Sequence, residues 1–100
     1  MIKLKQLYGS LTLSELKQEI ESIKEIQKNK IKYFSVLMSV YKKDSANDLV
    51  KTFASIFRNS ILPSQIVIVE DGPLTSELYL VIRSIKECWP NRIDIITLKQ

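Results

Sequence analysis

The sequence predicts an α/β fold in which a β-α-β-α-β unit forms a parallel half sheet, preceded by an amphipathic helix. Two observations support this. Short β-branched runs alternate with longer segments of helical periodicity, and these runs are apolar at consecutive positions, as in strands buried on both faces of a parallel sheet. The 100 residues, 45% hydrophobic and 26% charged, suit one globular domain or part of a larger one.

The first predicted element is an amphipathic helix over residues 11–30. Leucine and isoleucine recur there at spacings of three and four, at Leu13, Leu16, Ile20 and Ile23. Thr12 followed by Glu15 forms a capping-box pattern at its start. Because its polar face is not strongly cationic, the narrow apolar stripe favours packing on the rest of the chain or on another chain over a membrane surface.

The next elements are a strand over residues 33–40 and a helix over about 46–60. The strand is apolar at consecutive positions, and Ser45 with Asp48 forms a second capping-box pattern. Pro63 is expected to interrupt the connection to a second strand, over residues 65–69.

A turn over residues 70–73 is expected to end the second strand, followed by a helix over about 75–88 and a third strand over 93–98. This order predicts neighbouring parallel strands joined by right-handed crossovers. The expected boundary near 30–33 divides the chain into a helical N-terminal extension, 1–32, and an α/β part, 33–100.

Composition excludes several chemistries. Without histidine, the usual His-based acid–base catalysis, Ser-His-Asp triads and His-ligated metal sites are absent. Two glycines form neither a Walker loop nor a GxGxxG fingerprint, and the single Cys88 suits a reducing compartment. The net charge is +4, but the basic residues are interleaved with glutamate and form no basic stripe. No nucleic-acid partner is therefore expected. No signal or membrane-spanning run is visible, and the expected location is the cytoplasm, with peripheral membrane association as an alternative.

Candidate ligand-binding residues follow the first two strands. Ligands bind beyond the carboxyl ends of parallel strands, and here those ends carry Ser39, Tyr41, Glu70 and Asp71. Tyr41 could stack on a planar base, Asp71 could accept hydrogen bonds from an imide or a ribose, and Ser39 leaves room for a ring. The alternatives are that Tyr41 only covers the core and that Asp71 belongs to an ordinary Asp-Gly turn.

Residues 33–100 resemble the N-terminal part of a family 2 glycosyltransferase with the Rossmann-like GT-A fold. The resemblance rests on residues 34–41, 49–59 and 66–75, in that order and spacing. It implies transfer of a sugar from a nucleotide-sugar, commonly a UDP-sugar, to a saccharide or other acceptor, as in polysaccharide biosynthesis. It also implies that Ser39, Tyr41 and Asp71 hold the nucleoside, with Glu70 a weaker candidate.

The chain departs from the family pattern in several places. The family often has Pro or Thr at the position of Ser39 and commonly Asn at that of Lys42. The Asp-x-Asp motif that binds divalent Mn or Mg, and the catalytic base, have no counterpart in these 100 residues. We therefore assign no catalytic residue and no metal ligand, and we expect no transferase activity from this chain alone.

A second hypothesis is a non-catalytic interaction module in which helix 11–30 binds a partner or self-associates. A folding argument favours the first hypothesis, that the chain is part of a glycosyltransferase, because a strand of this kind normally lies in the middle of a sheet and here it would have a free edge. The missing C-terminal half, a second copy of the chain or helix 11–30 must cover this edge. The isolated chain is therefore expected to form homo-oligomers, to aggregate or to be only marginally stable.

Overall fold

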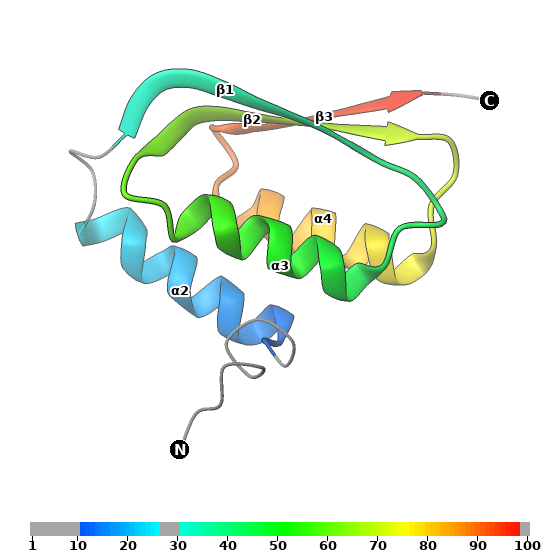
Figure 1. Cartoon of the computed structure of the whole chain (residues 1–100), viewed down its shortest axis with the longest axis horizontal. Helices are drawn as coiled ribbons and strands as arrows, with labels where there is room; N and C mark the ends of the chain where they lie inside the picture. The colour runs from blue at the N-terminus through cyan, green and yellow to red at the C-terminus, as the bar shows by residue number, and fades with distance from the viewer. Residues whose placement is uncertain (1–10, 27–30, 99–100) are drawn as a thin grey trace.

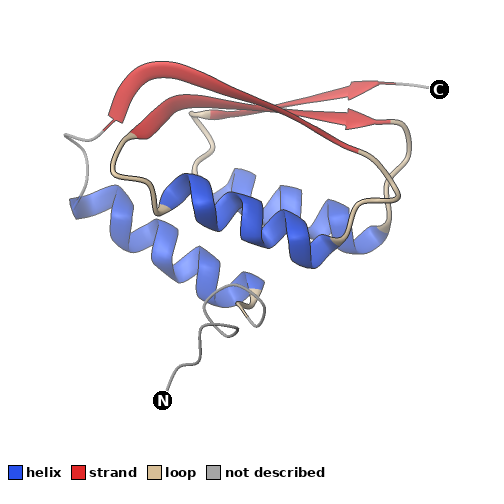
Figure 2. Cartoon of the chain, viewed as in Figure 1, coloured by secondary structure: helices blue, strands red, loops and turns tan. Residues whose placement is uncertain are grey.

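The computed structural model describes residues 11–26 and 31–98, in which a parallel sheet of three strands in the order β1-β2-β3 carries all the described helices on one face (Figures 1 and 2). The elements are α2 (Leu13–Ile26), β1 (Ile31–Val40), α3 (Ala46–Phe57), β2 (Leu62–Asp71), α4 (Ser76–Cys88) and β3 (Ile93–Leu98). The predicted α/β class, element order and parallel pairing are confirmed.

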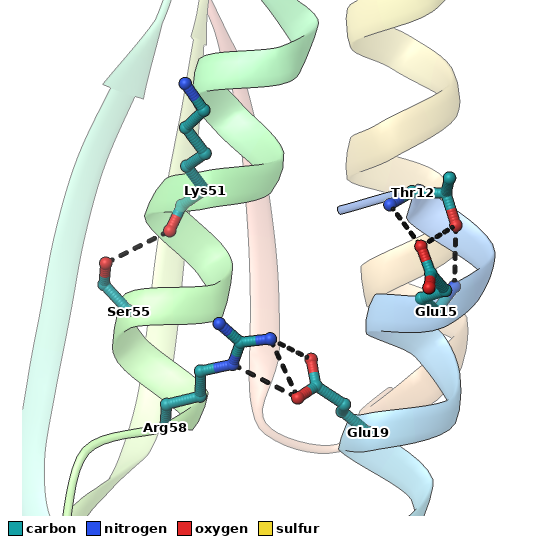
Figure 3. Close-up of polar contacts among 6 residues, drawn as sticks. All are labelled: Thr12, Glu15, Glu19, Lys51, Ser55 and Arg58. Atoms are coloured by element: carbon teal, nitrogen blue, oxygen red, sulfur yellow. Dashed lines mark hydrogen bonds and ion pairs between the residues drawn. The ribbon is translucent and has the colours of Figure 1, made fainter. Parts of the chain in front are cut away.

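Helix α2 begins at the predicted capping box. The Glu15 N–H donates to the Thr12 hydroxyl oxygen at 3.1 Å, and the Thr12 N–H donates back to a Glu15 carboxylate oxygen at 3.0 Å (Figure 3). The Thr12 hydroxyl also donates to this carboxylate, at 2.9 Å. The hydrogen bonds that the Glu15 carboxylate accepts, first from the Thr12 backbone and then from its hydroxyl, lower the pKa of this exposed carboxyl. The reciprocal pair satisfies donors that a helix start otherwise leaves unpaired.

The two crossover helices are capped in a similar way. The hydroxyl oxygen of Ser45 accepts the Asp48 N–H at the start of α3, and that of Thr75 accepts the Leu78 N–H at the start of α4. Both helices begin at the edge where the preceding strands end (Figure 1). Their N-terminal turns are therefore fixed beside the carboxyl ends of the sheet.

The apolar stripe of α2 packs within the chain. Leu16 and Ile20 are fully buried, and α2 contacts both α3 and α4. At its outer side Glu19 accepts hydrogen bonds from Arg58 at the end of α3, the shortest at 2.9 Å (Figure 3). The predicted packing of this stripe is confirmed, while residues 27–30 of the predicted helix lie outside the described residues.

The expectation that the first strand is buried on both faces is wrong for this chain. Its helix side contributes to the core, but on the other face Leu37 is 71% exposed and Tyr33 is completely exposed. The reason lies in the topology. The chain moves from β1 to β2 to β3 in one direction, so right-handed crossovers place α3 and α4 on the same face. The opposite face is left open.

Several predicted boundaries shift. Strand β2 begins at Leu62, so Pro63 lies inside its first residues, where a missing N–H is tolerated. Glu70 and Asp71 are the last residues of β2, and the turn begins at Gly72, whose φ of 80° favours glycine. Helix α3 ends at Phe57, three residues before the predicted end. Strand β3 has the predicted bounds, and Cys88 is buried as expected.

None of the helices in the described part of the chain combines the length and the apolar character that a bilayer span requires.

The burial of α2 leads to a stability prediction. Ile20→Ala removes a fully buried side chain from the helix layer and should lower the free energy of unfolding by about 2–5 kcal/mol, measured by urea denaturation. Gln18→Ala, at an exposed position of the same helix, should change it by less than about 0.5 kcal/mol. Equal effects of the two variants would contradict a core role for α2.

The open sheet face leads to a prediction about self-association. Leu37→Lys and Ile96→Lys place a charge among exposed apolar residues of β1 and β3 and should each shift the chain toward monomer in sedimentation velocity. Leu80→Lys, at a 61% exposed position of α4 in the helix layer, is the control and should leave association unchanged. A chain that is monomeric at all concentrations before substitution would contradict the prediction.

Candidate functional site

The candidate site is a cavity at the carboxyl ends of β1 and β2. Parallel pairing places Val40 opposite Glu70, so the segments that follow the two strands leave the sheet at the same edge. The cavity there has a volume of about 220 Å³ and is lined by Tyr41, Lys42, Asp71, Gly72 and Pro73. The structure thus brings together two of the predicted site residues, Tyr41 and Asp71.

The β1 side of the cavity is a closed turn over residues 41–44. The Asp44 N–H donates to the Tyr41 carbonyl oxygen at 2.9 Å, and the Tyr41 N–H donates to the Asp44 carboxylate at 2.9 Å. These two hydrogen bonds fix both ends of the turn. The Tyr41 side chain is 48% exposed, which leaves part of it available to a ligand.

Ser39 lies near this cavity but does not line it. It is an exposed residue of β1, opposite Val69 of β2, and it lines a neighbouring hollow of about 280 Å³ together with Asp44 and Ser45. Its predicted part in holding a nucleoside therefore has no support from the cavity.

Glu70 lies on the other side of the sheet. Side chains alternate between faces along a strand, so Glu70 points toward the helices while Asp71 points away from them. Glu70 is 1% exposed, and one of its carboxylate oxygens accepts a hydrogen bond from the Thr97 hydroxyl at 2.9 Å. The other oxygen has no hydrogen-bond partner among the described residues. Glu70 is absent from the lining of the cavity.

The lining of the cavity carries side chains of the types that contact nucleosides, and its described residues include no metal-binding group. A tyrosine ring can stack on a base, a carboxylate can accept hydrogen bonds from an imide or a ribose, and an ammonium group can pair with an anion. The described residues hold no group of three or more His, Cys, Asp or Glu side chains placed to bind a metal ion. The divalent Mn or Mg that the family resemblance implies therefore has no fitting ligand set in this part of the chain.

The sequence did not identify Lys42, Gly72 and Pro73 as lining residues of the cavity. From the sequence, Lys42 belongs to the polar segment after the first strand, where a solvated side chain is the simplest interpretation, and it departs from the family pattern. The sequence feature that indicates a place in the cavity lining is its position directly after Tyr41, because a tight turn at the end of a strand keeps adjacent residues at the same edge of the sheet.

The buried carboxylate leads to a prediction. A buried polar atom without a partner costs about 1–3 kcal/mol, and exposed Thr97 can bond to water instead. Glu70→Met should therefore raise the free energy of unfolding by about that amount in urea denaturation. The control, Glu87→Met at an exposed position of α4, should have little effect. A less stable Glu70→Met variant would show that the carboxylate stabilises the fold.

Comparison with known proteins gives one specific relationship. No family model matches the chain, and no solved structure matches it. A stretch of 51 residues is 47% identical to the UDP-Gal:alpha-D-GlcNAc-diphosphoundecaprenol beta-1,3-galactosyltransferase of Escherichia coli. The match covers 51% of this chain and 18% of that relative, so the chain spans less than a fifth of the relative's length. About half of this chain is therefore related in sequence to a glycosyltransferase.

Proposed function

We propose that this chain is the donor-nucleotide-binding part of a GT-A glycosyltransferase of family 2 that uses a nucleotide-sugar, specifically a UDP-sugar. The observation that carries the proposal is the cavity that joins Tyr41 and Asp71 at the ends of two adjacent parallel strands. The relationship to a galactosyltransferase whose name specifies UDP-Gal supports it independently.

The size of the cavity favours a nucleoside over a complete nucleotide-sugar. Pockets for small molecules usually have volumes of roughly 300–1,000 Å³. A cavity of about 220 Å³ lies just below that range. The base and ribose would occupy it, with the Tyr41 ring against the base and the Asp71 carboxylate accepting hydrogen bonds, while the phosphates and the sugar lie outside.

This part of the chain would bind and orient the donor without performing the transfer. In a glycosyl transfer the bond from the sugar to the diphosphate breaks while a bond to the acceptor oxygen forms, and the acceptor oxygen loses a proton. That chemistry needs a base for the proton and a positive charge on the leaving diphosphate. We propose no described residue as that base, and no described cluster could hold a divalent cation at the diphosphate. Groups outside the described residues would complete the transfer.

The structure gives less support to the interaction-module hypothesis. That hypothesis needs the apolar stripe of helix 11–30 to be available to a partner. Leu16 and Ile20 are fully buried against the helix layer of the same chain. Binding through that stripe would require α2 to leave the core.

Titration of the folded chain with uridine, UMP and UDP tests the proposed function. We expect binding, measured by isothermal titration calorimetry. Asp71→Ala and Tyr41→Ala should each weaken uridine affinity about fivefold or more, because a hydrogen bond to a carboxylate and a stacked ring each contribute about 1–3 kcal/mol.

Two control variants separate these effects from a general loss of charge or aromatic surface. Glu87→Ala removes an exposed carboxylate near the end of α4, and Tyr33→Ala removes a fully exposed tyrosine near the start of β1. Both should bind uridine like the unaltered chain. No binding at millimolar uridine, or equal binding by Asp71→Ala, would refute the proposed function.

A further inference from the structure

Among the described residues that line the cavity, one is cationic, Lys42. It stands at the second position of the turn over residues 41–44, directly after Tyr41. Lys43 follows it in the same turn but does not line the cavity. Lys42 takes part in no ion pair with the described residues, whereas Lys51 and Arg58 pair with Asp48 and Glu19.

The turn restricts where the Lys42 side chain can reach. Asp44 closes the turn with two hydrogen bonds to Tyr41, one through its backbone N–H and one through its carboxylate. The backbone of Lys42 is therefore held at the rim of the cavity, and its ammonium group lies on a flexible stem of four carbons. A ligand that extends beyond the cavity at this rim passes within reach of that group.

Two further cationic side chains of the described chain, Lys86 and Arg92, lie away from the cavity. Lys86 donates hydrogen bonds to the carbonyl oxygens of Pro90 and Ile93, and Arg92 lies over the Trp89 ring, so both are at the end of the sheet where β3 begins. The described residues contain no cluster that could hold a divalent cation. Among the described residues, Lys42 is thus the cationic residue of the cavity lining.

We infer that Lys42 binds the phosphate groups of the nucleoside diphosphate, while Asp44 acts as a positioning residue that holds the turn. The inference rests on the proposed function and adds to it the orientation of the ligand. The base and ribose lie between Tyr41 and Asp71, and the diphosphate leaves the cavity on the β1 side.

A comparison of uridine, UMP and UDP binding by Lys42→Ala tests the inference. We expect the affinity for UDP to fall about tenfold, since a charge-assisted contact to phosphate is lost, and the affinity for uridine to change less than twofold. The affinity for UMP should fall by no more than that for UDP and by more than that for uridine. Lys42→Arg keeps the charge and should retain most of the UDP affinity.

Lys43→Ala is the matched control, because it removes the same charge from the next residue of the same turn. Its UDP affinity should fall less than threefold. Raising the salt concentration from about 50 to about 200 mM should weaken UDP binding. This weakening should be smaller for Lys42→Ala than for Lys43→Ala, because the Lys42→Ala variant lacks the phosphate contact that exchanges counterions.

The outcomes distinguish this inference from the proposed function. Equal losses of uridine and UDP affinity in Lys42→Ala, or equal losses of UDP affinity in the two lysine variants, would overturn the role of Lys42 and leave the nucleoside site intact. The inference also fails if the unaltered chain binds uridine and its affinity for UDP is no higher than its affinity for uridine. Absence of uridine binding by the unaltered chain would overturn the proposed function and the inference together.

Discussion

The handedness of the two β-α-β crossovers is the constraint on which the rest of the structure depends. Both crossovers advance in the same direction across the sheet, so α3 and α4 must lie on one face. The same geometry returns every strand in parallel, which brings the ends of β1 and β2 to one edge and forms the cavity there. It also leaves the other face uncovered. The cavity and the exposed apolar surface therefore have one cause.

The helix layer is completed by α2, which lies outside the β-α-β-α-β unit in sequence but contributes fully buried residues to its core. Two crossover helices alone would leave part of their own apolar surface exposed. The Leu16 and Ile20 side chains cover it, and the ion pair between Glu19 and Arg58 joins α2 to the end of α3 at the surface. A segment without a match in the family resemblance is thus a structural part of the fold.

Features set by local chemistry could be predicted, and features set by distant contacts could not. The capping box of Thr12 and Glu15 and the bounds of β3 follow from neighbouring residues, and both agree with the structure. The exposure of Leu37 depends on what covers the far side of the sheet, which an apolar run cannot reveal. That Glu70 and Asp71 point to opposite faces of the sheet could have been predicted from the sequence. Side chains alternate between faces along a strand, and both residues belong to β2 and not to the turn that the sequence predicts.

The open face and the candidate site are adjacent, which gives the exposed surface a connection to ligand binding. Ser39, Val69 and Ile96 stand side by side across the three strands, and the next residue toward the cavity on that face of β2 is Asp71. Any polypeptide that covers the apolar face contacts this row, because exposed apolar area drives such contact. It would then lie against the strand ends that position Tyr41 and Asp71. Ser39, which does not line the cavity, belongs to this row of the open face.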